Sequence, residues 1–141
     1  MSSALVELRH KTWTRAEVET LIAAGHFEGQ RFELIEGEIF DKMGQNPSHA
    51  AGICRLVSAL AAIFGLDQIR TQLPVEPGMR DAPHSLPEPD VAVTVESAAA
   101  YGKVHPRAGD IILVAEVSDT TYYFDTKRKA KLYARADFSS I

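Results

Sequence analysis

The run Ile111–Val117 restricts the fold more than any other part of the chain. It reads Ile-Ile-Leu-Val-Ala-Glu-Val and shows no alternation of polar and apolar residues. A strand of this kind is covered on both faces, because a strand with one solvated face carries a polar residue at every second position. The chain must therefore place helices on both sides of a sheet, which predicts an α/β fold.

Helices are predicted before, between and after the strands. Thr14-Arg-Ala-Glu17 has the form of a capping box and predicts a helix that ends near Gly25. Asn46-Pro-Ser-His49 opens a second helix, which runs to about Phe64 and ends at Gly65. The pattern at Asp125–Ala136 predicts a third helix.

The remaining strands come from shorter patterns. Phe32–Phe40 predicts a hairpin with its turn at Gly37, and Ile69–Val75 and Asp90–Val95 each predict a single strand. The predicted order is helix, hairpin, helix, three strands and helix, which indicates a mixed β-sheet flanked by helices. The proline-rich stretch Pro74–Pro89 is interpreted as a loop inside one domain.

Size and composition set limits on function. The 141 residues suit one domain, predicted over 1–141, and 45% hydrophobic residues argue against a disordered chain. The single cysteine, Cys54, excludes an intramolecular disulfide and a cysteine-based zinc site. A net charge of −4 argues against a protein that coats nucleic acid through general basicity, but it does not exclude a nuclease.

No membrane partner is expected. The longest apolar stretches, near Leu56–Leu66 and Ile111–Val117, are shorter than a membrane span. Met1–Arg9 lacks the basic and apolar regions of a signal peptide. These features predict a cytoplasmic protein.

Three charged residues stand out by position. Glu116 lies in the apolar run, where a carboxylate is costly unless it is paired or bound to a metal. At 100° per residue, Lys129 shares its helix face with Leu132 and Tyr133, away from the other basic residues of that helix. Asp90 follows Pro89 at the start of a strand.

Each of these residues also has a plainer interpretation. Asp90 alone fits a turn residue better than a functional group. Lys129 can pair with Asp125 one turn earlier, which stabilises a helix by only a few tenths of a kcal/mol. Together, however, two carboxylates on neighbouring strands and one lysine suit phosphodiester hydrolysis. Carboxylates hold Mg²⁺ or Mn²⁺, the ion activates water, and the lysine places positive charge beside the reacting phosphate.

The sequence resembles the Uma2 family of restriction-endonuclease-like proteins, which belongs to the PD-(D/E)XK nuclease superfamily. Five segments carry the resemblance in the family's order, from about Thr12 to Ala136. They are Arg31-Phe-Glu-Leu-Ile-Glu-Gly-Glu38, Pro47-Ser-His49, Pro89-Asp-Val91, Ala115-Glu-Val-Ser118 and Asp125-Thr-Lys-Arg-Lys129-Ala-Lys-Leu-Tyr133.

The resemblance implies a restriction-endonuclease-like fold and a role for each matched residue. Asp90 and Glu116 are the expected metal ligands, and Lys129 is the expected catalytic lysine. Glu33 is the expected additional acidic residue, with Glu36 and Glu38 as competing candidates. His49 matches a family position and is a candidate for substrate contact, although helix capping or packing explains it equally well.

The chain also departs from the family pattern in two places. Ser118 stands where the superfamily motif has its lysine, and the resemblance implies that this lysine has moved to Lys129. Family members continue beyond the last helix with a Tyr-Trp-Ile-Val-Asp-like segment, whereas this sequence ends at Phe138-Ser-Ser-Ile141. We therefore expect that strands completing the sheet are missing, and that an exposed edge favours a homo-oligomer, with a dimer as the simplest form.

Three functions remain open on the sequence. The first is a metal-dependent endonuclease that hydrolyses DNA phosphodiester bonds, with Mg²⁺ or Mn²⁺ as cofactor. The second is a catalytically incomplete module of the same fold that acts in oligomerisation or nucleic-acid binding. The third, and weakest, is another hydrolase that uses His49 or His84, because no pair of histidines has metal-ligand spacing.

Overall fold

A four-stranded sheet forms the centre of the computed structural model, which describes residues 8–42, 46–117 and 123–141 without the side chains of 123–126. Its strands are β3 (Ile69–Thr71), β4 (Val91–Thr94), β5 (Ile111–Ala115) and β6 (Ser139–Ser140), in that spatial order. β3, β4 and β5 are antiparallel, whereas β6 runs parallel to β5. The predicted mixed sheet is therefore confirmed.

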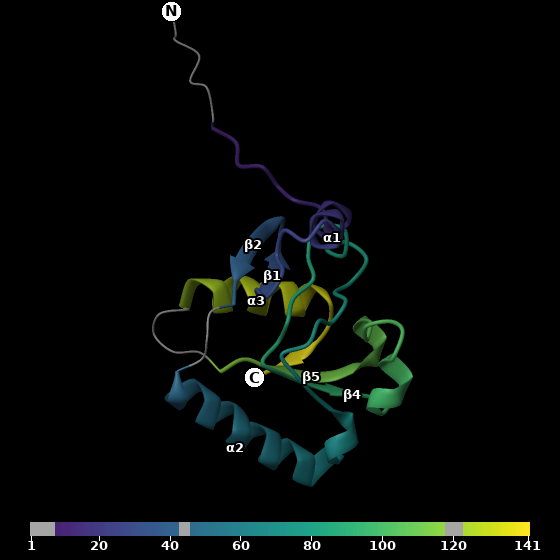
Figure 1. Ribbon diagram of the computed structural model, residues 1–141. Helices are drawn as coiled ribbons and strands as arrows, with labels where there is room; N and C mark the ends of the chain where they lie inside the picture. The colour runs from purple at the N-terminus through teal and green to yellow at the C-terminus, as the bar shows by residue number, and fades with distance from the viewer. Residues whose placement is uncertain (1–7, 43–45, 118–122) are drawn as a thin grey trace, which may run out of the picture.

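Helices cover both faces of this sheet (Figure 1). On one face, α2 (Pro47–Phe64) packs Ile53 and Leu60 against Val91, Val93 and Ala115. On the other face, α3 (Tyr123–Arg135) and the chain that follows it pack residues against Ala92 and Val114. Alternate residues of β4 and β5 thus enter different cores, which explains why Ile111–Val117 shows no polar alternation.

The predicted helix ends are confirmed by their caps. α1 (Arg15–Ala23) begins at a capping box, in which Thr14 accepts from the Glu17 backbone and Glu17 accepts from the Thr14 backbone. Asn46 caps α2 by accepting from the backbone of His49. Gly65, at a φ of 92°, ends α2 because this left-handed conformation costs glycine little.

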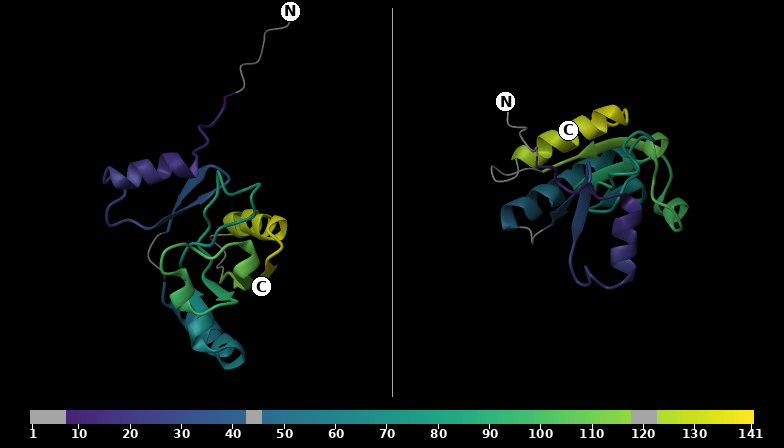
Figure 2. Two further views of the ribbon diagram at one scale, coloured as in Figure 1. Left: turned by 90° about the vertical axis from the view of Figure 1, so that its right-hand side faces the viewer. Right: turned by 90° about the horizontal axis from the view of Figure 1, so that it is seen from above.

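The hairpin forms a small sheet of its own rather than joining the main one, which corrects the single sheet expected from the sequence. β1 (Phe32–Ile35) pairs with β2 (Glu38–Asp41), and the two-residue turn at Glu36 and Gly37 has positive φ at both positions. Such a turn matches the twist of the two strands. Figure 2 shows α1 and this hairpin at the opposite end of the molecule from α2.

Two predicted strands end earlier than their apolar patterns do. β3 ends at Thr71 because Gln72 has a φ of 52°, which takes the chain out of the extended conformation, and Pro74 follows. β5 ends at Ala115, so Glu116 lies directly after the strand. Among the described residues, three short 3₁₀ helices that the sequence patterns did not predict lie in the loops: η1 (Leu66–Gln68), η2 (Ala98–Tyr101) and η3 (Ala108–Asp110).

β6 was also not predicted. Leu113 pairs with Ser139 and Val114 with Ser140, and the Ile141 backbone continues the ladder by donating to Val114 and accepting from Glu116. Two serines carry no strand pattern, so only the position of the chain after α3 brings them to β5. The last residues therefore pair with one edge of β5, and the expectation of an exposed sheet edge and a homo-oligomer remains a prediction.

α2 has the length that the sequence predicts, but its apolar stretch is longer than the segment near Leu56–Leu66. Its 18 residues have a mean hydropathy of 1.3, which is sufficient by length and composition alone for a membrane span. One side of this helix packs on the sheet through Ile53 and Leu60, while 11% of the 18-residue window is buried. The expectation of a chain without a membrane partner remains a prediction.

Candidate active site

The register of β4 and β5 brings Asp90 and Glu116 together. Val91 is paired with Ala115, so the next positions outward, Asp90 and Glu116, face each other at one end of the strand pair. Opposite residues of an antiparallel pair project to the same face. Ala92 and Val114, two positions inward, pack on the α3 side, which places both carboxylates on that side.

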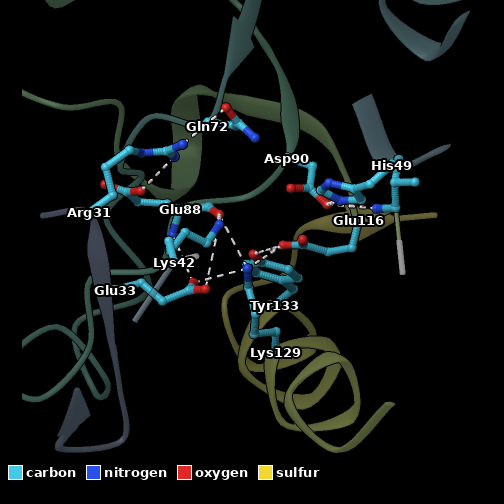
Figure 3. A network of polar contacts seen from close by, with 11 residues as sticks. Arg31, Glu33, Lys42, His49, Gln72, Glu88, Asp90, Glu116, Lys129 and Tyr133 are labelled. Atoms are coloured by element: carbon cyan, nitrogen blue, oxygen red, sulfur yellow. Dashed lines mark hydrogen bonds and ion pairs between the residues drawn. The ribbon is translucent and has the colours of Figure 1, made fainter. Parts of the chain in front are cut away.

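Lys129 of α3 links Glu116 to Glu33 of the hairpin (Figure 3). Its Nζ lies 2.6 Å from Oε1 of Glu116 and 2.9 Å from Oε1 of Glu33, and it donates to the Glu88 carbonyl at 3.2 Å. An ammonium group has three N–H donors, so these three acceptors use all of them. Lys129 is only 4% exposed, and the helix-face prediction that it points inward is confirmed.

The charges of the cluster depend on one another. Burial opposes the charge of Lys129, but the carboxylates of Glu116 and Glu33 outweigh this effect and raise the pKa of Lys129 above its ordinary value. Burial raises the pKa of Glu116, and the nearby charge of Asp90 adds to the rise, while Lys129 opposes it. Lys129 is therefore a permanently protonated group at neutral pH.

Tyr133, one helical turn after Lys129, also contacts Glu116. Its hydroxyl donates to Oε1 of Glu116 at 2.6 Å, and burial followed by the charge of Glu116 raises the pKa of Tyr133 well above its ordinary value. The phenol therefore remains a donor. The sequence placed Tyr133 on the inward face of the helix but gave no reason to assign its hydroxyl a partner.

Glu33 is the hairpin carboxylate that reaches the cluster. It is 7% exposed, whereas Glu36 and Glu38 lie outside and form ion pairs with Arg128. The structure thus separates three candidates that the sequence left open. The catalytic role of Glu33 remains a prediction.

His49 approaches Asp90 from the first turn of α2. Its Nε2 lies 3.3 Å from Oδ2 of Asp90, and the Val117 backbone donates to the same oxygen at 2.7 Å. Asp90 is 5% exposed, so these two contacts fix the orientation of a buried carboxylate. The histidine side chain therefore belongs to the cluster, while its contact with substrate remains a prediction.

Lys42 and Glu88 also belong to the cluster, and the sequence did not predict either of them. Lys42, which directly follows β2, lies with its Nζ 3.5 Å from Oε2 of Glu33 and donates to the Glu88 carbonyl at 2.8 Å. The Glu88 side chain pairs with Arg31 at 3.4 Å, and burial raises its pKa. No local pattern marks Lys42, because its position depends on how the hairpin folds over α3.

The carboxylates of Asp90 and Glu116 have the chemistry of a Mg²⁺ or Mn²⁺ site. In the part of the chain that the structure describes, Oδ1 of Asp90 and Oε2 of Glu116 have no hydrogen-bond partner. Within those same residues, no group of three or more acidic, histidine or cysteine side chains is arranged to hold a metal. Magnesium commonly binds through one or two carboxylates and completes its shell with water and substrate oxygens. The residues present therefore fit such an ion.

Two predicted features lie outside the description of the structure. Ser118, at the motif position of the missing lysine, is not among the described residues, and the side chain of Asp125 is not described either. The alternative pairing of Lys129 with Asp125 is therefore untested. The contacts that are described already give Lys129 a full set of acceptors.

Comparison with protein-family models identifies the family of this chain. The family model of Uma2, described as a putative restriction endonuclease, matches residues 16–139. This match includes every side chain of the cluster, from Glu33 to Tyr133. A comparison with curated proteins finds no match. Because the family match covers most of the chain, the protein belongs to the Uma2 family, whose known class is the PD-(D/E)XK nuclease superfamily.

Proposed function

We propose that this protein is a metal-dependent endonuclease that hydrolyses phosphodiester bonds of DNA. The observation that carries the proposal is the pair of carboxylates, buried Asp90 and partly buried Glu116, next to the buried ammonium group of Lys129. Membership of a restriction-endonuclease family supports nuclease activity in general. Metal dependence and the DNA substrate are inferred from the chemistry of the cluster.

Asp90 and Glu116 would hold the divalent ion through their free oxygens. When bound there, the ion supplies Lewis-acid activation of the phosphate and lowers the pKa of a bound water. Hydrolysis of a phosphodiester adds the oxygen of a water molecule to phosphorus and breaks one ester P–O bond, and a proton from the water goes to the leaving oxygen. The two carboxylates remain unchanged by the reaction.

Lys129 would supply electrostatic stabilisation rather than a base. Its raised pKa keeps it protonated at neutral pH, so it cannot accept a proton from water. Its charge, 2.6 Å from Glu116, is held next to the site where negative charge develops on the phosphate. Glu33 and the Glu88 carbonyl hold the ammonium group in this position and leave it little freedom.

His49 and Tyr133 would act by orienting the two ligands. His49 contacts Oδ2 of Asp90, and Tyr133 donates to Oε1 of Glu116. In each case the contact uses one carboxylate oxygen and leaves the other for the ion. Such fixed second contacts are typical of metal-binding carboxylates, which are themselves hydrogen-bonded.

The proposal is tested by nicking of a supercoiled plasmid with Mg²⁺, with Mn²⁺ and with EDTA. We expect cleavage by the wild type with either ion and none with EDTA, and none by D90N or E116Q. A matched control is E36Q/E38Q, which neutralises two exposed hairpin glutamates and should cleave normally. Equal cleavage by D90N, E116Q and the wild type would overturn the assignment. DNA binding without metal-dependent cleavage would favour the alternative of a non-catalytic module.

A further inference from the structure

The cluster contains two lysines that hold the same pair of acceptors from opposite sides. Lys129 contacts Oε1 of Glu33 and the Glu88 carbonyl, and Lys42 contacts Oε2 of Glu33 and the same carbonyl. The two lysines come from different elements, α3 and the segment after β2. Glu33 thus pairs with two ammonium groups, one at each carboxylate oxygen (Figure 3).

The two ammonium groups differ in what they can still bind. Lys129 has three acceptors for its three N–H donors, and its side chain is 5% exposed. Lys42 has two acceptors among the described residues, and its side chain is 16% exposed. One donor of Lys42 therefore remains for a ligand that arrives from solvent.

The chemistry of the surroundings selects an anionic oxygen as that ligand. Lys42 is linked to Glu116 through contacts that it shares with Lys129, since both lysines contact Glu33 and the Glu88 carbonyl and Lys129 also contacts Glu116. A phosphodiester bound through an ion on that pair would present further oxygens to its neighbours. Lysine is a common phosphate contact, because it acts as a compact point charge with rotatable donors.

We infer that Lys42 is a further catalytic residue that donates to a phosphate oxygen of the substrate, while Lys129 is held in place by Glu33, Glu116 and Glu88. This inference rests on the proposed nuclease function for its substrate. It assigns the two lysines different tasks. Lys129 supplies charge beside the phosphate while its three donors stay on protein acceptors, and Lys42 makes a hydrogen-bonded contact with the nucleic-acid backbone.

The test is the salt dependence of DNA binding in a background that cannot cleave. D90N/E116Q removes both the proposed ion ligands and their repulsion of phosphate, so binding is measured independently of cleavage. In this background, K42Q keeps a hydrogen-bond donor for the Glu88 carbonyl but loses the charge, and K42R keeps the charge. K103M is the matched control, because Lys103 is an exposed lysine in the loop between η2 and η3.

Fluorescence anisotropy of a labelled DNA duplex of mixed sequence is the readout. Loss of one phosphate contact lowers the slope of log K against log[salt] by about 0.9 for duplex DNA. We expect the slope for K42Q to be smaller in magnitude by about 0.9 than that of its background. Over a fourfold range of salt concentration, the affinity of K42Q should therefore change by a factor about 3.5 times smaller. K42R and K103M should retain the slope of their background. An unchanged slope for K42Q would overturn the inference, as would a chain that binds no duplex at low salt.

Amine modification of the unaltered protein provides a second measurement that needs no variant. We expect duplex DNA to protect Lys42 from acetylation several-fold, as read by mass spectrometry, and to leave Lys103 unprotected. Equal modification of Lys42 with and without DNA would contradict the inference. A lowered slope for K42Q together with no cleavage by the wild type would instead support the phosphate contact and contradict the nuclease proposal.

Discussion

Replacement of Lys129 by methionine should destabilise the protein strongly. The side chain is 4% exposed, and its removal leaves Glu33 and Glu116 without their shared counter-ion. Removal of one partner from a buried ion pair typically costs about 3–5 kcal/mol, because the other charge stays buried and unpaired. Methionine fills a similar volume, so a cavity adds little to this cost.

The remaining contacts place the expected loss near the lower end of that range. Glu33 keeps Lys42 at 3.5 Å and the Glu88 backbone N–H at 3.2 Å, and Glu116 keeps the Tyr133 hydroxyl. We therefore expect K129M to lower the free energy of unfolding by about 3 kcal/mol. Urea unfolding at neutral pH, followed by far-ultraviolet circular dichroism, measures this change.

Two variants complete the experiment. K131M changes an exposed lysine of the same helix and should stay within about 0.5 kcal/mol of the wild type. The triple variant E33Q/E116Q/K129M removes all three charges and should recover most of the loss, because the one charge that loses its carboxylate is Lys42, which is partly exposed and keeps the Glu88 carbonyl. A K129M protein within about 1 kcal/mol of the wild type would show that Lys129 does not compensate the two carboxylates.

Three further predictions concern the support of the site and the fold. Y133F removes the donor to Oε1 of Glu116 without creating a cavity and should cost about 1.5–3 kcal/mol in urea unfolding, and an unchanged midpoint would exclude a stabilising role for this bond. G37A adds a Cβ that would lie 2.8 Å from Cβ of Thr12 at a φ of 82°, so it should cost about 1–3 kcal/mol. T12G/G37A should recover the part of this stability loss that comes from the clash with Thr12 and keep the part that comes from the positive φ. Full recovery of stability would show that the backbone conformation contributes no strain. Hydrogen bonds from the Lys11 side chain and from the Thr14 backbone lower the pKa of Glu17 to about 2. The ionised Glu17 therefore contributes its full stabilisation above pH 4.5, the ordinary pKa of a glutamate, and this stabilisation is lost as the pH falls toward 2. E17Q should therefore be less stable than the wild type at neutral pH and approach it in acid, and a stability difference that does not depend on pH would disprove this coupling.

Local chemistry made the helix ends and the turn predictable. A threonine with a glutamate three residues later, an asparagine before a proline and glycines after apolar runs each solve a backbone problem within a few residues. Thr14, Asn46 and Gly65 are found in those roles. The ends of β3 and β5 were harder to predict from the sequence, because pairing with neighbouring strands decides where a strand stops.

The candidate site was predictable where one element alone reveals the anomaly. Lys129 interrupts the apolar face of a helix, and Glu116 follows an apolar strand, so both are visible in the sequence. The choice of Glu33 over Glu36 and Glu38 needed the structure. Residues 33–35 of β1 are all buried, so this strand lacks the alternation of buried and exposed positions that would show which carboxylate points to α3.

Lys42 and the Tyr133 hydroxyl were not predicted for a different reason. Tyrosine on an apolar helix face is typical of a core residue, and only the position of Glu116 gives its hydroxyl a partner. Lys42 reaches Glu33 and the Glu88 carbonyl only after the hairpin has folded over α3. Contacts between elements far apart in sequence determine both residues.

Calorimetric titration of Mg²⁺ and Mn²⁺ is the most direct measurement of whether Asp90 and Glu116 form a metal site. The titration compares the wild type with D90N/E116Q, and with E36Q/E38Q as a control that removes the same number of negative charges from the surface. We predict that the wild type and E36Q/E38Q bind the ions and that D90N/E116Q does not. Equal binding by all three proteins, or binding by none, would contradict a metal site on these two carboxylates.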